Sequence, residues 1–446
     1  MITRRLPHQI DPAPALVALF ALLIGTALPA SAVPYLESGY GGQSPWYSAE
    51  INALGASGGA AYRGGFSTIL NPAGLGAADT WRLDAGVGFA YHEEERFVPL
   101  YDSFENYVTD QSIASNQRTW TETGFALAGR LNLGDLPLGV GLSLADRYPF
   151  SYEFTEEVRD PDVFSDPRDR ILEERMQEVT GTLRTLSFGI AGEAQRVALG
   201  ASVHYAFGER TEQRRVRDYA TDDATGDDSF DTESSWDLSG VNATIGAQVM
   251  PNERLTLSVA YETALSVDGE LETTTYAAGP DTTVIGEADH SLEYPARWRL
   301  GAAIYPRNDP RTVLTVDVVL TGWEDDLVDD REDLADDRRT APRYLQDVVD
   351  VRVGLRHEFR GGQELNVGFR RYDSYNDPEG GNSIFSAGTA WPVGPGRLAV
   401  ALELNKLQTR DVPHLFDYPD DGYVVPDEAR VDDLRLRFGV GWTQEF

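Results

Sequence analysis

The sequence contains no cysteine, and past its N-terminus it has no apolar run long enough to cross a membrane as a helix. Without cysteine, disulfide bonds, thiolate zinc sites and cysteine nucleophiles are excluded. Positive charge is scarce as well, because 38 Lys and Arg stand against 72 Asp and Glu, which gives a formal net charge of −34. So acidic a chain does not suit nucleic acid, whose phosphates are bound by Lys and Arg. We therefore expect no nucleic-acid partner.

Familiar catalytic signatures are missing too. The six histidines are scattered, and neither His-Glu-x-x-His nor Gly-x-Ser-x-Gly occurs. Serine and histidine from neighbouring strands could still meet in a membrane-embedded hydrolase, so that alternative stays open. We expect a protein that is not an enzyme, has no catalytic residues and needs no metal, nucleotide or other cofactor.

The N-terminus has the pattern of an export signal. Arg4 and Arg5 form a positive region, residues 15–28 form an apolar core, and Ala30-Ser31-Ala32 is a small-x-small cleavage site. A membrane anchor is the alternative, but the apolar run is shorter than the ~20 residues that a spanning helix needs. We predict a signal peptide over residues 1–32, cleaved after Ala32. The mature chain is then either soluble and exported or built into a membrane from strands.

The C-terminal stretch, residues 433–446, alternates between two kinds of side chain. Apolar residues occupy every second position from Leu434 to Trp442, and Arg, Gly or Thr occupies most positions between them. A single strand of this kind could belong to a soluble sandwich. Followed by the terminal Phe446, it is more typical of the strand that closes an outer-membrane barrel, with one face toward lipid and the other toward the lumen. Phe446 is then the expected contact for the barrel assembly machinery.

The same alternation recurs along residues 80–446. Short and long connections alternate between the matching segments, as expected of an all-β, transmembrane antiparallel β-barrel of about 14 strands, whereas a soluble sandwich gives no reason for this rhythm. The predicted strands are residues 80–92, 118–133, 136–154, 182–193, 196–209, 236–250, 254–267, 291–305, 311–322, 347–359, 364–373, 382–391, 397–407 and 431–446.

Acidic residues gather in the long connections, with nine of them between Glu324 and Asp337. Carboxylate oxygens suit calcium, so a divalent-cation site is one interpretation, but no Asp-x-Asp-x-Asp-Gly loop with a distal Glu occurs. We prefer a solvated loop surface whose charges repel one another. In another long connection, residues 168–178 have helical character and are expected to form a short helix.

The segment over residues 33–79 is rich in Gly, Ala and Ser and contains Asn71-Pro72-Ala73-Gly74-Leu75. This motif resembles the Asn-Pro-Ala-Gly-Leu signature of the FadL/TodX group of outer-membrane channels for long-chain fatty acids and aromatic hydrocarbons. Residues 294–323 are similar to that family's Pro…Leu-Gly…Pro strand and the Asp-Val…Thr-x-Trp strand after it. Residues 350–373 look like its paired strands that end in a tyrosine and an acid.

The resemblance implies an N-terminal hatch over residues 33–79 that plugs the lumen of a barrel formed by residues 80–446. It places the protein in the outer membrane of a diderm (Gram-negative-type) bacterium, surrounded by outer-membrane lipid and lipopolysaccharide. It further implies passive uptake of hydrophobic small molecules, namely long-chain fatty acids or hydrocarbons. The alternative is a non-transporting envelope barrel that acts as a scaffold or interaction protein.

The alternation also places arginines inside the expected lumen. An amphipathic acid could bind its carboxylate there, because the guanidinium fork is planar and always charged. Alternatively, these arginines pair with Asp317, Glu358 and hatch carbonyl groups and merely satisfy a polar interior. The candidate residues for a ligand carboxylate are Arg297, Arg299, Arg352, Arg356, Arg370, Arg435 and Arg437.

Overall fold

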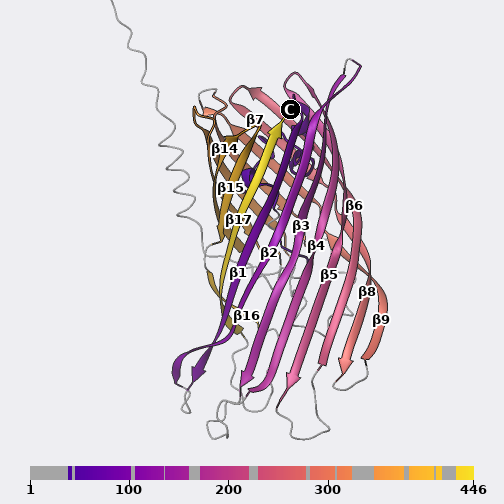
Figure 1. The fold of residues 1–446 in the computed structure, drawn as a ribbon, viewed down its shortest axis with the longest axis vertical. Coiled ribbons are helices and arrows are strands. Elements are labelled where there is room, and N and C mark those ends of the chain that lie inside the picture. The colour runs from indigo at the N-terminus through magenta and orange to yellow at the C-terminus, as the bar shows by residue number, and fades with distance from the viewer. Residues whose placement is uncertain are drawn as a thin grey trace, which may run out of the picture.

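A computed structural model of the chain describes residues 39–42, 46–101, 106–134, 136–159, 171–219, 230–277, 282–306, 309–323, 346–375, 381–405, 408–413 and 428–446. The predicted signal peptide and the acidic residues 324–337 lie outside these ranges. The described residues form a closed, fourteen-stranded antiparallel β-barrel (Figure 1), which confirms the predicted fold class.

Seventeen strand segments make up the fourteen barrel strands, because β7 and β8, β9 and β10, and β15 and β16 are each one interrupted strand. The segments are β1 (Arg82–Tyr101), β2 (Tyr107–Leu133), β3 (Leu136–Arg159), β4 (Ile171–Ala194), β5 (Val197–Asp218), β6 (Phe230–Asn252), β7 (Leu255–Glu262), β8 (Leu265–Ala277), β9 (Thr282–Tyr294), β10 (Arg297–Ile304), β11 (Thr312–Thr321), β12 (Val348–Glu358), β13 (Glu364–Asp373), β14 (Gly381–Val393), β15 (Gly396–Asn405), β16 (Gln408–Pro413) and β17 (Glu428–Glu445).

The first and last strands close the barrel. The pairing of β1 with β17 runs from the Arg82–Glu445 pair to the Phe97–Arg430 pair. The backbones of Trp81 and Phe446 exchange two further hydrogen bonds, of 2.9 and 3.2 Å. The C-terminus therefore lies at the end of the barrel that carries the short turns, which is the upper end in Figure 1. We call this the short-turn end and the opposite one the long-connection end.

Side chains alternate between the two faces of the wall as predicted. On β10, Trp298 and Leu300 are 49% and 47% exposed, whereas Arg299 between them is 8% exposed. On β17, Phe438 is 46% exposed and Arg437 is 4% exposed. Apolar side chains thus face outward and arginines inward, which is the arrangement that a membrane-spanning barrel requires.

The strands continue well past the ends that apolar alternation predicted. β2 begins at Tyr107 rather than near residue 118, and β8 and β9 form a paired hairpin over a connection expected to be a loop. The predicted helix over residues 168–178 is wrong where it is described, because residues 171–178 belong to β4. These extensions have polar outward side chains, such as Glu153, Thr155 and Glu157 of β3, so the apolar pattern stops although the hydrogen-bonded ladder does not.

A bulge at Arg147 reverses the faces of β3. Up to Leu144 the even-numbered residues point outward, and Leu142 is 42% exposed. The register with β4 shifts between Asp146 and Tyr148, and beyond this shift the even-numbered residues are buried. One extra residue in a strand is enough to exchange its two faces. The row of aromatic residues at 148, 150, 152 and 154 therefore points into the lumen.

The wall between β2 and β3 is paired over only part of its height. Their ladder runs from Leu133 and Leu136 to Gly124 and Ala145 and ends there, although β2 continues alongside β1 and β3 alongside β4. Beyond that point β1 and β2 bend away from β3 (Figure 1). Side chains bridge the two strands instead: Asn116 Oδ1 accepts a 3.0 Å bond from Thr155 N, and Arg118 donates to the Tyr152 carbonyl at 3.3 Å.

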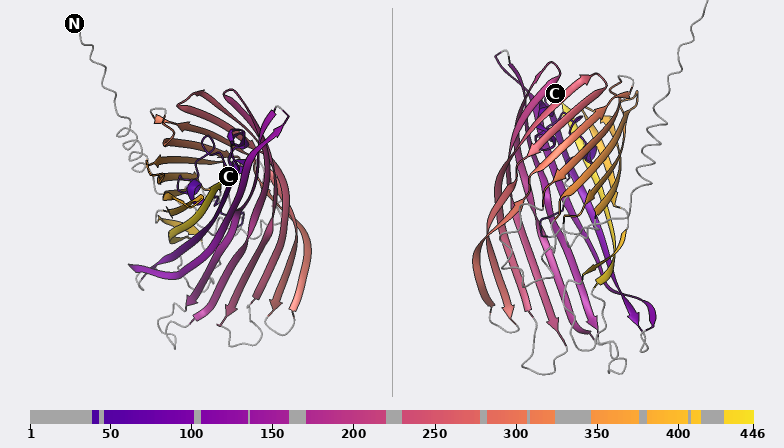
Figure 2. Two further views of the ribbon diagram at one scale, coloured as in Figure 1. Left: turned by 45° about the horizontal axis from the view of Figure 1, so that its top comes forward. Right: turned by 180° about the vertical axis from the view of Figure 1, so that it is seen from behind.

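The N-terminal segment, residues 46–78, lies inside the barrel near the short-turn end (Figure 2). It contains α3 (Ala49–Asn52), α4 (Ser67–Leu70) and the 3-10 helix η1 (Pro72–Ala77). Glycines in the wall leave room for this segment, because a side chain there would collide with it. A Cβ on Gly139 would lie 1.8 Å from the Leu75 carbonyl oxygen, and one on Gly439 would lie 1.8 Å from Trp46 Cη2. Among the described residues, no helix combines the length and the apolar character needed to cross a membrane.

Candidate ligand-binding site

An aromatic cluster occupies the lumen on the long-connection side of the N-terminal segment. Its rings make edge and stacked contacts, with centroid distances of 5.2 Å between Tyr40 and Trp323 and 4.5 Å between Trp323 and Tyr375. Aliphatic side chains such as Val179, Leu183 and Val267 continue the same apolar surface. The aromatic cluster consists of Tyr40, Tyr148, Phe150, Tyr152, Phe154, Tyr294, Trp323, Tyr372 and Tyr375, all of which are buried.

Tyr40 belongs to the N-terminal residues, not to the wall. Its ring contacts Tyr294, Trp323 and Tyr375, and its carbonyl accepts a 3.0 Å hydrogen bond from the Tyr294 hydroxyl. Gly42 N donates to the Pro149 carbonyl at 2.9 Å. A part of the chain that is not a strand therefore fills the centre of the aromatic cluster.

Four guanidinium groups form a second cluster between the aromatic rings and the N-terminal segment. We call Arg147, Arg297, Arg299 and Arg352 the arginine cluster. All four act electrostatically on the Tyr47 phenol; burial raises the pKa of this phenol, but their combined positive field outweighs burial and holds the pKa below its ordinary value of 10. The cluster touches the aromatic residues directly, because Arg297 donates to the Tyr148 hydroxyl and the Arg147 guanidinium lies 5.6 Å from the Tyr148 ring centre.

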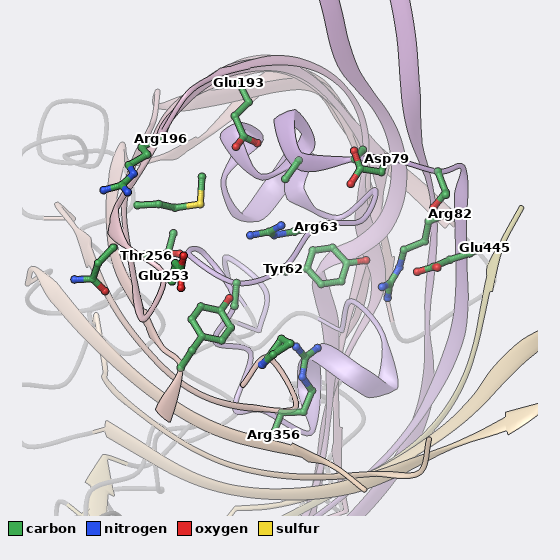
Figure 3. A pocket seen from close by; sticks show the side chains of 18 of the residues that line it. Tyr62, Arg63, Asp79, Arg82, Glu193, Arg196, Glu253, Thr256, Arg356 and Glu445 are labelled. Atoms are coloured by element: carbon green, nitrogen blue, oxygen red, sulfur yellow. The ribbon is translucent and has the colours of Figure 1, made fainter. Parts of the chain in front are cut away.

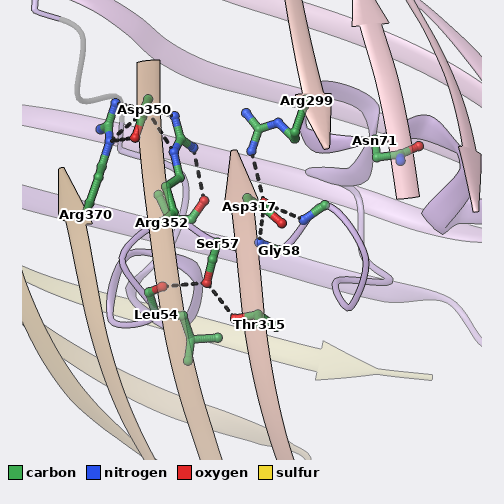
Figure 4. A network of polar contacts seen from close by, with 12 residues as sticks. Leu54, Ser57, Gly58, Asn71, Arg299, Thr315, Asp317, Asp350, Arg352 and Arg370 are labelled. Carbon is green, nitrogen blue, oxygen red and sulfur yellow. Dashed lines mark hydrogen bonds and ion pairs between the residues drawn. The ribbon is translucent and has the colours of Figure 1, made fainter. Parts of the chain in front are cut away.

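Carboxylates pair with this cluster but do not balance it. Glu262 accepts two 2.6 Å bonds from Arg147 and lies 3.6 Å from Arg297. Asp317 is 3.5 Å from Arg299, and Asp350 is shared by Arg352 and Arg370 (Figure 4). With Arg370 added to the cluster, five guanidinium groups thus face three carboxylates among the described residues. Arg147 is 3% exposed, and its Nε and Nη1 have no hydrogen-bond partner within the described part of the chain. A ligand carboxylate would supply both the missing charge and the missing acceptors.

The arginines that the sequence predicted as ligand contacts lie in four different surroundings. Arg299, Arg352, Arg370 and Arg437 are buried and already paired with carboxylates, and Arg352 also binds the Ala56 carbonyl of the N-terminal segment at 3.1 Å. Arg297 reaches the aromatic cluster. Arg356 instead lines a cavity at the short-turn end, and Arg435 is buried on the inward face of β17. Pairing within a polar interior therefore accounts for most of the set.

The predicted hatch motif anchors the N-terminal segment to the wall. Asn71 Oδ1 accepts a 3.0 Å bond from Ala73 N, and its Nδ2 donates to the Ala247 and Val259 carbonyls at 3.3 and 3.2 Å. Pro72, Ala73, Gly74 and Leu75 follow as η1, all buried. A side chain on wall residue Gly200 would collide with Pro72, since its Cβ would lie 2.6 Å from the Pro72 carbonyl oxygen.

Serine and histidine do meet inside the barrel, as the hydrolase alternative requires. His204 Nδ1 lies 2.7 Å from Ser187 Oγ, and its Nε2 lies 2.8 Å from Thr244 Oγ1. Hydroxyl groups thus occupy both ring nitrogens, so no carboxylate orients the ring as in a catalytic triad. His204 is fully buried. No group of three or more histidine, aspartate or glutamate side chains in the described ranges is placed to hold a metal ion.

A cavity of about 950 Å³ opens on the other side of the N-terminal segment, at the short-turn end (Figure 3). The N-terminal segment contributes Glu50 and residues 61–63 to its lining, and the wall contributes Arg356, Tyr305 and the turn residues near 195 and 253. The aromatic cluster and this cavity therefore lie on opposite sides of the N-terminal segment.

Sequence reasoning did not identify Arg147, Glu262, Asp350 or the aromatic cluster, including its row on β3, as residues of the site. One signal was available. If all even-numbered residues from 138 to 154 faced lipid, that face would be ~50 Å long at ~3.3 Å per residue, or roughly 37 Å in height for a strand tilted by ~45°, whereas the apolar band of an outer-membrane barrel is only ~25 Å tall. Part of that face therefore has to turn away from lipid.

No family model matches the sequence, and no curated protein is similar to it in sequence. Solved structures share its fold. A FadL homologue of Pseudomonas aeruginosa has a TM-score of 0.65 at 14% identity, over 91% of this chain and all of that one. The P. putida toluene transporter TodX has a TM-score of 0.60 at 13% identity, over 90% of this chain and 98% of that one. The Ralstonia pickettii toluene transporter TbuX has 0.57 at 11%, with the same coverage. The resemblance to the FadL/TodX group is thus confirmed at the level of the fold.

Proposed function

We propose that the protein is an outer-membrane channel for the passive uptake of hydrophobic small molecules that carry an acidic head group, long-chain fatty acids being the class that fits best. The observation that carries this proposal is the contact between the buried aromatic cluster and the unbalanced arginine cluster. An acyl chain would lie against the aromatic rings, while its carboxylate would accept hydrogen bonds from Arg147 and Arg297. The toluene transporters with the same fold leave neutral hydrocarbons as the competing substrate class.

Residues 33–79 would act as the hatch that closes the lumen between the ligand and the short-turn end. The stretch where β2 and β3 are not paired would serve as a side entrance to the aromatic cluster once the side chains that bridge it move apart. It begins where the outward residues change from Phe125 and Leu144 to Thr121 and Glu153, which is the outer edge of the apolar band. An amphipathic molecule at the membrane surface would reach the cluster there without crossing the charged long connections. Concentration difference and downstream consumption would drive net uptake.

Whole-cell uptake tests this proposal. Cells with the gene should accumulate a labelled long-chain fatty acid faster than cells without it. The gene should increase the uptake rate of the methyl ester and of an alkane of equal length by less, because neither carries the negative charge that the arginine cluster lacks. Equal uptake of all three in cells with and without the gene would leave a non-transporting scaffold barrel as the better explanation. A gain restricted to the alkane would instead point to a hydrocarbon channel.

Tyr40→Ala should tighten ligand binding. The Tyr40 ring fills the centre of the aromatic cluster, so an acyl chain has to displace it, and removing the ring removes a competitor held at high local concentration. We expect the Kd of a long-chain acid, measured by calorimetry in detergent, to fall by about five- to tenfold, a gain of roughly 1–1.4 kcal/mol. A higher Kd would mean that the Tyr40 ring contacts the bound ligand and stabilises it.

A further inference from the structure

We propose that Ala60–Arg63 form a flap between the arginine cluster and the cavity at the short-turn end, and that the ligand leaves the lumen through this cavity when the flap opens. The proposal rests on the proposed function and adds the route by which a ligand passes the N-terminal segment. In this route the body of the segment stays seated, and only these four residues move.

The strip Gly58–Arg63 separates the arginine cluster from the cavity at the short-turn end. On one side, the Gly58 and Gly59 amides donate to Asp317 Oδ2 at 2.9 Å each, and a Cβ on Gly59 would lie 3.1 Å from Arg299 Cδ of the arginine cluster. On the other side, residues 61–63 line the cavity (Figure 3), and Arg63 is exposed although it lies within the mouth of the barrel. Displacing a few residues would therefore connect the arginine cluster with the cavity.

The rest of the N-terminal segment is fastened to the wall at short intervals. Before the strip, Gly55 N donates to Ser386 Oγ at 3.0 Å and Ser57 Oγ lies 2.6 Å from Thr315 Oγ1. After it, Thr68 Oγ1 lies 2.6 Å from Ser143 Oγ, and Asn71 holds two wall carbonyls. These contacts come from strands around the whole barrel, so the segment as a body cannot shift without breaking many of them.

The flap has one hydrogen bond to the wall within the described residues, from the Tyr62 hydroxyl to Asp84 Oδ2 at 2.9 Å. Ala60 adds an apolar contact with Ala303 and Val313. A pair of glycines stands at each end of the flap, Gly58-Gly59 and Gly64-Gly65. Glycine backbones rotate into conformations closed to other residues, so both ends can act as hinges. The flap is thus held to the wall mainly through Tyr62, whose hydroxyl bonds Asp84 and whose ring lies 5.3 Å from the Arg82 guanidinium, and it is the part that separates the arginine cluster from the cavity.

A disulfide that ties the flap to its anchored end tests this route, and the chain has no native cysteine to interfere. In Gly58→Cys/Tyr62→Cys the two Cβ atoms would lie 3.3 Å apart, slightly inside the ~3.5–4.5 Å usual for disulfides. Oxidation should lower uptake of a long-chain fatty acid by about tenfold or more, because the gating motion is blocked, and reduction should restore it.

Two control pairs fasten other parts of the N-terminal segment with similar geometry. The Cβ atoms would lie 3.3 Å apart in Ala49→Cys/Gly441→Cys and 3.4 Å apart in Gly76→Cys/Ala198→Cys. Oxidation of either control should leave uptake unchanged. If a control disulfide blocks uptake as well, the segment moves as a body and the flap proposal is overturned; if the flap disulfide leaves uptake unchanged, the proposal is also overturned.

A second variant covers the case in which loss of Tyr62 itself disables the double-cysteine protein. Tyr62→Phe keeps the ring and removes the hydrogen bond to Asp84, which frees the flap, so uptake should rise. Unchanged or reduced uptake would show that this bond does not hold the flap closed. Failure of the proposed function gives a different result, because then the unmodified protein, with its native flap, transports no fatty acid at all.

Discussion

Gly139→Val is expected to convert the closed barrel into an open pore. A Cβ on Gly139 would lie 1.8 Å from the Leu75 carbonyl oxygen, and backbone cannot yield as a flexible side chain does. Overpacking typically costs about 1–3 kcal/mol, and we expect at least the upper end of that range here. The wall itself should not suffer, because valine suits a strand better than glycine does. The N-terminal segment should therefore leave its seat while the barrel remains folded.

Two measurements follow this change. Single-channel recording in planar bilayers should show long-lived openings that the unmodified protein lacks, and trypsin should cleave after Arg63, which is exposed only within the barrel mouth. Gly192→Val is the matched control, since its Cβ would meet only Leu138 Cδ2, at the ordinary distance of 3.6 Å. If Gly139→Val showed no such openings, the segment would have to remain packed against the wall despite the added side chain.

The number of strands and the faces of most of them followed from the sequence, because lipid imposes an apolar residue at every second position. Trp298, Leu300 and Phe438 carry that signal, and the arginines between them had to face inward. The extensions of β2 and β4 carried no such signal, since water outside the apolar band accepts polar side chains on either face. Alternation therefore detects the membrane and not the whole ladder.

The candidate site was harder to predict because it depends on one inserted residue and on distant partners. The bulge at Arg147 changes no residue type, yet it moves Tyr148 and Phe150 from the lipid side to the lumen. Glu262, which pairs with Arg147, lies 115 positions away in the sequence. Arg352 and Arg370 were rightly placed inside, but their shared partner Asp350 emerges only from the folded geometry. Periodicity gives the face of a residue and leaves its partner undetermined.

Arg147→Met is expected to separate acidic from neutral ligands. The unpartnered Nε and Nη1 groups of Arg147 are the donors that a carboxylate would use, and hydrogen bonds to charged groups are worth about 1.5–3 kcal/mol. We expect the Kd of a long-chain acid to rise by about 10- to 100-fold while that of its methyl ester changes by less than about threefold. Glu262 keeps Arg297 at 3.6 Å and Asn242 at 3.0 Å, so the substitution does not strand a buried carboxylate.

Arg184→Met is the matched control for the charge itself. Arg184 stands at the same height on β4 and binds Asp146, next to the bulge, at 2.9 Å, but it faces outward and its side chain is 53% exposed. Losing it should leave both Kd values unchanged, because the buried Asp146 keeps two bonds from Thr123, at 2.6 and 2.9 Å, and the lumen keeps its excess of positive charge. Arg147→Lys should give an intermediate result for the acid, since lysine keeps the charge without the planar fork. If Arg147→Met instead weakened acid and ester equally, Arg147 would be a structural residue of the β3 bulge, and the acidic head group would have to bind elsewhere in the lumen.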